Sequence, residues 1–248
     1  MTATSPIKRV LLLFAMEAEA NPLISKLSLK KDDPQMVSGP APCVTYSGIV
    51  GDLQVHVAWN GKCAVNSVDN VGTVPASLTA YLTIQALDPD LVISAGTAGG
   101  FKAQGAAIGD TFVGTSVVNH DRRIPIPGFD KYGIGELQSP PTPGLQTALG
   151  FKSGVISSGN SLDYTDKCLE IMGSHKAAVK EMEAAAIAWV CNLYSKPLIC
   201  VKSITDIVDG GRPSHEEFLE NLSTAAVALQ TAVPRVLEFV SGKTMADL

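Results

Sequence analysis

Short apolar runs alternate along the chain with stretches of helical character. Residues 9–15, 91–95 and 198–205 are nearly continuous apolar runs, as expected for strands that are covered on both faces of a sheet. Weaker patterns predict further strands at residues 44–48, 53–59, 111–118, 154–158 and 177–181, with Gly51-Asp52 as the turn of a hairpin between the first two.

The intervening segments predict helices. They are expected at residues 17–27, 183–194 and 216–240, and from about 65 to 87 with Pro75 as a kink or restart. Residues 120–144 are rich in proline and predict a long excursion of the kind that is usually functional. Alternating strands and helices predict an α/β fold, a sheet between layers of helices. Because no linker divides the chain, we expect one domain over residues 1–248.

The amino-acid composition excludes several classes of protein. Of the 248 residues, 46% are hydrophobic and 17% charged, which is too apolar for a disordered chain. The longest strongly apolar run, residues 10–16, is far shorter than the roughly 20 residues that cross a membrane. The net charge of −5 gives little support to nucleic-acid binding, which depends on cationic side chains. We therefore expect a small-molecule ligand, with no membrane and no nucleic acid as partner.

The five cysteines stand singly, and none forms a Cys-x-x-Cys pair. An odd number of scattered cysteines argues against a closed set of disulfides. The first residues are polar and lack the apolar stretch of a secretory signal. The expected location is therefore cytoplasmic, with the cysteines serving as small hydrophobic residues.

Several predicted strands end at residues capable of chemistry, and α/β sheets bind ligands where their strands end. Glu17 and Glu19 follow the first strand, where an acid can also simply complement a helix dipole. Residues 96–100, Gly-Thr-Ala-Gly-Gly, would let a ligand approach the backbone, although a tight turn explains these glycines equally well. Their spacing fits neither a dinucleotide fold nor a P-loop.

Two further strand ends are acidic. Residues 180–183 read Lys-Glu-Met-Glu, and Asp206 ends the apolar run 198–205. Asp206 is either an ordinary helix cap or a buried acid whose raised pKa keeps it ready to donate a proton. Acids at three strand ends on one edge of a sheet are a stronger signal than any of them alone.

Four segments together resemble the nucleoside phosphorylase/hydrolase superfamily, and within it the 5′-methylthioadenosine nucleosidases of plant type. They are Ala-Met-Glu-Ala-Glu at 15–19, Ala-Gly-Thr-Ala-Gly-Gly at 95–100, Glu-Met-Glu-Ala at 181–184 and Ser-Ile-Thr-Asp at 203–206. Residues 120–127 and 205–210, followed by Glu-Glu-Phe-Leu at 216–219, look especially plant-like. The resemblance covers nearly the whole chain in order.

This resemblance implies a central mixed sheet flanked by helices, a homodimer, and no metal or organic cofactor. It implies hydrolysis of the N-glycosidic bond of 5′-methylthioadenosine to adenine and 5-methylthioribose, a step of methionine salvage. By the same resemblance, Asp206 would protonate adenine N7 and Glu19 would activate water. Glu183 would bind the ribose hydroxyls and Met182 would pack against the sugar, with Lys180 and Glu181 lining the substrate site beside them.

Further positions follow from the resemblance. The hydroxyl of Thr97 would line the water site, and Lys202 would hold the acids in place. Leu162 stands where bacterial members stack an aromatic ring on adenine, and it offers no π-face. Asp163 should follow it in the base pocket. Asn160 departs from the acid usual in its segment.

Two alternatives stay open. A purine nucleoside phosphorylase would need a Gly-Asp-Pro-x-Arg loop after the first strand, whereas this chain has Glu19 there and no arginine nearby; a carboxylate repels phosphate. A catalytically silent purine-binding relative would be expected to lose Glu19 or Asp206, and both are present. We also expect S-adenosylhomocysteine to be cleaved weakly or not at all, because its charged tail would have to enter an apolar pocket. The excursion at 124–129 is expected to form that pocket's walls.

Overall fold

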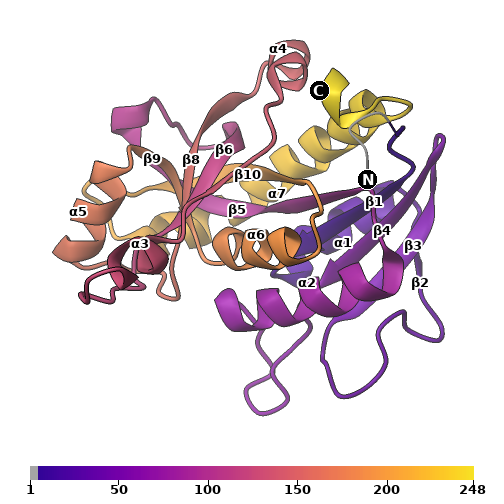
Figure 1. Ribbon diagram of the computed structural model, residues 1–248, viewed down its shortest axis with the longest axis horizontal. Helices are drawn as coiled ribbons and strands as arrows, with labels where there is room; N and C mark the ends of the chain where they lie inside the picture. The colour runs from indigo at the N-terminus through magenta and orange to yellow at the C-terminus, as the bar shows by residue number, and fades with distance from the viewer. Residues whose placement is uncertain (1–4) are drawn as a thin grey trace.

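The computed structural model describes residues 5–248. It shows a ten-stranded mixed sheet with helices on both faces (Figure 1). The strands are β1 (Arg9–Phe14), β2 (Lys30–Lys31), β3 (Val44–Val50), β4 (Leu53–Trp59), β5 (Leu91–Gly100), β6 (Thr111–Asn119), β7 (Leu137–Gln138), β8 (Lys152–Ser158), β9 (Ala177–Glu181) and β10 (Leu198–Ile207). The predicted mixed sheet with flanking helices is therefore confirmed, whereas a single domain over the whole chain stays a prediction.

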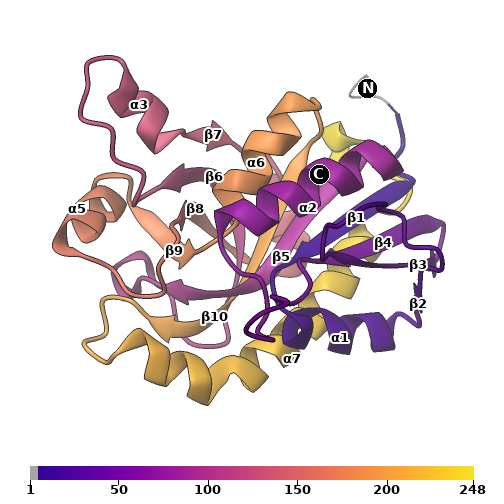
Figure 2. The same ribbon diagram turned by 90° about the horizontal axis from the view of Figure 1, so that it is seen from below.

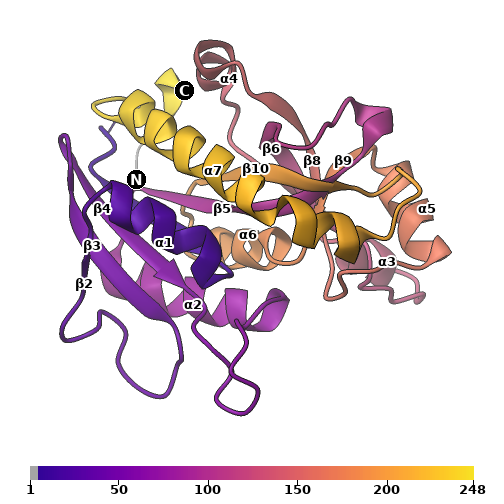
Figure 3. The same ribbon diagram turned by 180° about the vertical axis from the view of Figure 1, so that it is seen from behind.

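The helices form a layer on each side of the sheet. They are α1 (Glu17–Lys26), α2 (Thr73–Leu87), α3 (Phe129–Ile134), α4 (Pro143–Leu149), α5 (Asp166–Ser174), α6 (Ala184–Leu193) and α7 (Ser214–Val240). Helices α1 and α7 lie together on one face, and α2 and α6 lie together on the other (Figures 2 and 3). Within residues 5–248, no helix has the length and apolar character needed to cross a membrane.

Strand pairing brings the ends of three strands to one edge. β1 pairs in parallel with β5, and β5 pairs in parallel with β10. In the strand order β10-β6-β8-β9-β5-β1-β4-β3-β2, the additional pairing of β10 with β5 closes five strands into a ring. The carboxyl ends of β1, β5 and β10 consequently face the same side, which is where such sheets bind ligands.

Each face of the sheet has its own apolar core. Leu12 packs with Leu23 of α1 and Val233 of α7, whereas Leu11 packs on the other face with Ile84 of α2 and Ile187 of α6. Side chains alternate between the two faces along a strand, so a strand covered twice must be apolar at every position. Each fully buried leucine contributes about 1.5–3 kcal/mol, and this explains the unbroken run in β1.

The helix expected from residue 65 begins only at Thr73. Residues 60–72 form a loop, in which Val65 and Val68 are spaced like one helix face but are 88% and 59% exposed. Pro75 lies in the first turn of α2, where a helix needs no backbone donor. The proline therefore marks the start of the helix rather than a kink within it.

Three other segments differ from the expected pattern. The strand predicted at 91–95 continues as β5 through Gly100, so its glycines lie in a strand and not in a loop. The excursion at 120–144 contains α3 and β7 and reaches the first turn of α4. Helix α5, whose Thr165 cap accepts a hydrogen bond from the backbone of Cys168, was not predicted.

Candidate active site

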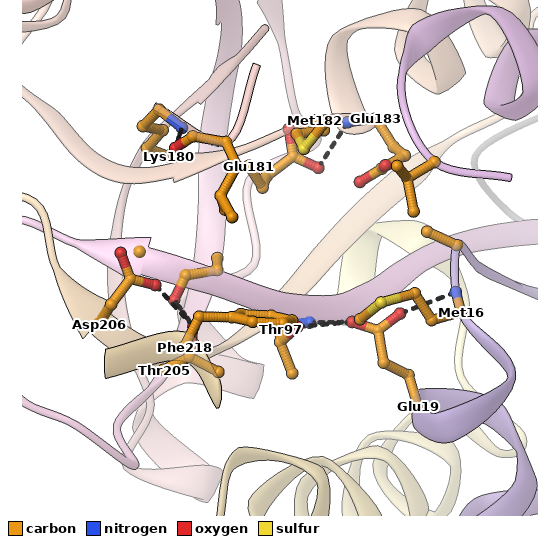
Figure 4. A pocket seen from close by; sticks show the side chains of 15 residues that line it. Met16, Glu19, Thr97, Lys180, Glu181, Met182, Glu183, Thr205, Asp206 and Phe218 are labelled. Carbon is orange, nitrogen blue, oxygen red and sulfur yellow. Dashed lines mark hydrogen bonds between the residues drawn. The ribbon is translucent and has the colours of Figure 1, made fainter. Parts of the chain in front are cut away.

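One cavity of about 230 Å³ opens at the shared carboxyl edge of β1, β5 and β10 (Figure 4). Small ligands bind at such strand ends in α/β sheets. Both acids expected to act in catalysis line it, at opposite ends of the view in Figure 4. Its lining consists of Ala15, Met16, Glu19, Val71, Thr97, Ala98, Gly99, Leu162, Lys180, Glu181, Met182, Glu183, Thr205, Asp206 and Phe218.

Glu19 is held at one end of the cavity by three backbone and side-chain donors. Its Oε1 accepts hydrogen bonds from the backbone nitrogen of Thr97 at 2.6 Å and from the Thr97 hydroxyl at 2.7 Å, and its Oε2 accepts from the Met16 backbone nitrogen at 3.1 Å. The side chain is buried, and burial raises the pKa of Glu19 against the opposing effect of these donors. A buried carboxyl group with a raised pKa is suited to accept a proton near neutral pH.

Asp206 lies at the other end, where β10 is irregular. The register of β10 against β5 shifts between Ile204 and Asp206, and Asp206 then lies opposite Gly99. A Cβ at Gly99 would come within 2.8 Å of the Asp206 carboxylate, so only glycine leaves it room. The Thr205 hydroxyl donates to Asp206 Oδ1 at 2.7 Å. Burial nevertheless raises the pKa of Asp206, which favours the protonated acid.

Glu183 and Met182 line the cavity on the side that faces Thr97 and Glu19 (Figure 4). Glu183 precedes helix α6 and accepts a hydrogen bond at 2.8 Å from the backbone nitrogen of Gly72 in the 60–72 loop. Burial and the neighbouring Glu181 raise the pKa of Glu183 to about 7. Since both side chains line the cavity, Glu183 offers it a polar group and Met182 an apolar surface.

Glu181 and Lys202 form a buried ion pair behind this wall, with Lys202 Nζ 3.0 Å from Glu181 Oε2. The same oxygen accepts from the backbone nitrogens of Ala184 at 2.8 Å and Glu183 at 3.1 Å, and Ser158 donates to the other oxygen. Burial opposes ionisation of Glu181, but these partners hold its pKa below the usual range. Although Glu181 lines the cavity, its two carboxylate oxygens bind Lys202, Ser158 and backbone nitrogens at the start of α6. The side chain therefore holds the start of this helix in place.

Lys180 anchors the loop that carries Leu162. Its ammonium group donates to the backbone oxygens of Ser161 at 3.0 Å and Leu162 at 2.8 Å. Burial lowers the pKa of Lys180, although the charge of Asp206 opposes this. Lys180 therefore fixes backbone oxygens at the cavity rim and keeps a positive charge near Asp206.

Two of the expected site residues, Asp163 and Lys202, lie outside the cavity. Leu162 lines the cavity, whereas Asp163 lies outside it in an adjoining groove with Tyr164, Arg212 and His215. Lys202 lies behind the cavity with Ser94, to whose hydroxyl it donates at 3.1 Å. No residue of 124–129 lines the cavity, so the excursion does not form its walls within one chain.

Sequence reasoning left Val71 and Phe218 without an assigned place in the site. Val71 lies in the 60–72 loop, where the sequence pattern predicts a helix. Phe218 lies just after the first turn of α7 and lines the cavity together with Asp206 and Thr205. The available signal was the plant-like Glu-Glu-Phe-Leu segment at 216–219, which contains Phe218.

The charge of the lining limits what can bind. Among the residues that the structure describes around the cavity, Lys180 is the one cationic side chain. Its ammonium group already donates hydrogen bonds to two backbone oxygens. Within residues 5–248, no cluster of three or more histidine, cysteine or acidic side chains is arranged to hold a metal ion. The cavity is thus suited to a largely neutral ligand that two carboxyl groups can approach.

Comparison with known proteins defines the class. Residues 9–238 match the family described as the Phosphorylase superfamily, and the chain belongs to it. Its resemblance to the 5′-methylthioadenosine nucleosidases is confirmed at the level of sequence. The chain is 44% identical to the 5′-methylthioadenosine nucleosidase of Arabidopsis thaliana over 243 residues, covering 98% of this chain and 91% of that protein.

A second Arabidopsis thaliana relative, a 5′-methylthioadenosine/S-adenosylhomocysteine nucleosidase, is also 44% identical and covers 98% of this chain and 96% of that protein. The structure of Arabidopsis thaliana 5′-methylthioadenosine nucleosidase in apo form superposes with a TM-score of 0.96 and 44% identity, covering 98% of this chain and all of that one. Relatives of this name are N-glycosyl hydrolases, so the prediction of an enzyme is confirmed.

Proposed function

We propose that this protein hydrolyses the N-glycosidic bond of 5′-methylthioadenosine, giving adenine and 5-methylthioribose for methionine salvage. The observation that carries the proposal is the placement of two buried acids, Glu19 and Asp206, at opposite ends of one largely apolar cavity. The names of both Arabidopsis relatives support the same substrate. Two opposed carboxyl groups are also the arrangement that cleaves glycosidic bonds in sugars.

Asp206 acts as the general acid. Adenine leaves poorly unless its N7 is protonated as the bond breaks, and the acid must therefore carry its proton at neutral pH. The raised pKa of Asp206, caused first by burial, favours that state. The backbone of the Leu162 loop, which Lys180 fixes, positions the base, while Asp163 lies in the adjoining groove.

Glu19 acts on the opposite side as the base for water. As the bond breaks, the sugar develops positive charge and water adds to the face away from adenine. The Thr97 hydroxyl and backbone hold the carboxylate of Glu19 in one orientation. Glu183 binds the ribose hydroxyls and Met182 packs on the sugar, while the Lys202–Glu181 pair keeps that wall rigid.

Phosphorolysis is not favoured. A phosphate ion would lie in the region of Glu19, which carries a carboxylate rather than a cationic group. A silent purine-binding protein would have no need for two buried acids with raised pKa values. The direct test is release of adenine from 5′-methylthioadenosine in phosphate-free buffer, and dependence of that release on added phosphate would overturn the proposal.

S-adenosylhomocysteine is cleaved weakly or not at all under this proposal. Met16, Val71, Met182 and Phe218 give the cavity an apolar character, and a charged amino-acid tail would have to be desolvated against it. Arg122, a candidate receptor for the tail carboxylate, instead donates to the backbone oxygens of Tyr132 and Gly133. Arg123 likewise donates to the His120 backbone oxygen.

The protein acts as a homodimer. Helices α2 and α6 present an outward surface, the α2/α6 face, made of Val74, Leu78, Tyr81, Trp189 and Leu193. Val74 is 77% exposed and Trp189 50% exposed, and both border a hollow that also includes Tyr132 of the excursion. Large exposed apolar patches mark interaction sites. A partner bound here would bring its own excursion toward the cavity and close the alkylthio end.

A cytoplasmic location fits the cysteines. All five are unpaired, and four of them are buried. Free thiols persist in a reducing compartment. The location itself stays a prediction, which fractionation of cells that produce the protein would test.

A further inference from the structure

We propose that Glu217 is a positioning residue for Asp206: it anchors the end of β10 to helix α7 and places a negative charge behind the acid. This inference rests on the proposed function, because it gives Asp206 the role of general acid. Glu217 lies in the first turn of α7, next to Phe218, which lines the cavity. One turn of helix thus contributes both a wall of the site and an anchor for the strand that carries the acid.

The anchor is a single charged hydrogen bond. The backbone nitrogen of Ile207, the residue after Asp206, donates to Glu217 Oε2 at 2.9 Å. Regular pairing of β10 with β5 is interrupted just before this point, between Ile204 and Asp206. A strand loses ladder hydrogen bonds at such an irregularity. Glu217 therefore binds the backbone immediately after this irregularity, where Ile207 lies opposite Gly100 again.

Neighbouring bonds show that the whole segment is held in place. The Val208 backbone nitrogen donates to Gly100 oxygen at 2.9 Å, and the Tyr164 hydroxyl donates to Val208 oxygen at 2.7 Å. Together with Glu217, these contacts fix residues 207 and 208 from three different elements. Asp206, immediately before them, is thereby fixed relative to the cavity.

Helix stabilisation alone does not explain Glu217. Acids near a helix start complement its dipole even when they face solvent, and the adjacent Glu216 is exposed. Glu217 is instead only 7% exposed, and Arg212 Nη1 lies 3.7 Å from its Oε1. Burying a carboxylate is unfavourable without strong partners, so a buried charge at this position indicates a use for its charge or its acceptor.

The negative charge of Glu217 acts on the pKa of Asp206 in a known direction. Asp206 is faced by Lys180 from β9, by Tyr164 from the loop before α5, and by Glu217 from α7. Lys180 favours the ionised form of Asp206, whereas Glu217 opposes it. Removing the charge of Glu217 should lower the pKa of Asp206, so the acid would lose its proton, and the enzyme its activity, at a lower pH.

The test compares pH profiles of kcat/KM for 5′-methylthioadenosine in the wild type, Glu217→Gln and the matched exposed control Glu216→Gln. Glutamine keeps an acceptor for Ile207 and loses the charge. The alkaline limb of Glu217→Gln should move to lower pH by about half a unit or more, whereas Glu216→Gln should overlay the wild type. Glu217→Ala, which also loses the acceptor, should lower kcat at the optimum roughly ten- to a hundredfold.

Profiles of Glu217→Gln that overlay the wild type, together with an unchanged kcat in Glu217→Ala, would overturn the proposal. Circular dichroism and thermal melting of each variant separate a loss of fold from a loss of positioning. Asp206→Asn is measured alongside. If it is inactive while the Glu217 variants behave normally, only the role of Glu217 fails; if it retains full activity, the assignment of the acid fails as well.

Discussion

Glu19 and Thr97 are joined by two hydrogen bonds that end on the same carboxylate oxygen, 2.6 Å from the Thr97 backbone nitrogen and 2.7 Å from its hydroxyl. Gly96 leaves room for this carboxylate, because a Cβ there would lie 3.1 Å from that oxygen and would press on it. Strand β5 therefore accommodates one acid at Gly96 and the other at Gly99. The glycine-rich end of β5 therefore lies between the two carboxyl groups and packs closely against both.

Glu19→Gln should retain the fold and lose about 10²–10⁴-fold in kcat, the usual contribution of a positioned proton transfer. Glutamine still accepts from Thr97 but cannot take a proton from water. Glu17→Gln is the matched control, since Glu17 faces outward and pairs with Lys62 at 2.8 Å. If Glu19→Gln keeps most of the wild-type kcat, Glu19 is only an acid at the start of a helix.

Glu183→Gln should weaken the pH dependence of stability. The pKa of Glu183 is raised to about 7 from an ordinary value of 4.5, so the folded state holds a proton that the unfolded state has released. Its contribution to the free energy of unfolding is complete below pH 4.5 and is lost as the pH rises to about 7. Urea unfolding across this window should show a smaller decline in Glu183→Gln than in the wild type or in Glu216→Gln. Equal declines in all three proteins would contradict the raised pKa.

Much of the fold could be predicted from the sequence because burial on both faces leaves an unbroken apolar run, as in β1. The start of α2 could not, because Val65 and Val68 have helical spacing but lie exposed in a loop. Within the site, the two acids could be located at strand ends. The resemblance predicts that Lys202 holds acids in place, but it does not predict that Glu181 is the partner or that Glu181 also binds the start of α6. These bonds depend on contacts between β9, β10 and α6 that no local pattern encodes.

Trp189→Glu should separate the protein into monomers and lower kcat/KM, because it places a charge in the centre of the α2/α6 face. Analytical ultracentrifugation gives the mass directly. Val227→Glu is the control, since Val227 is 57% exposed on α7, which covers the other side of the sheet. A wild-type protein that is monomeric and fully active would contradict the proposed dimer.

5′-Methylthioadenosine should be preferred over S-adenosylhomocysteine by about a hundredfold or more in kcat/KM, the effect expected when an unpaired charge must enter an apolar site. Both substrates share adenine and ribose, so Asp206 and Glu183 cannot distinguish them. The measurement is kcat/KM for the two under identical conditions. Near-equal values would show that a cationic group receives the tail, and Arg122→Ala and Arg123→Ala would then identify it.

The most direct test of the account follows the oxygen that attacks the sugar. 5′-Methylthioadenosine is turned over in ¹⁸O-labelled water with saturating unlabelled phosphate present, and the products are analysed by mass spectrometry. Because Glu19 is assigned to water activation, in the region where phosphate would bind, we expect adenine and free 5-methylthioribose with ¹⁸O at C1, and no sugar phosphate. Since C1 of the free sugar also exchanges its oxygen with water, the absence of sugar phosphate is the deciding result. Formation of unlabelled 5-methylthioribose 1-phosphate would contradict the account.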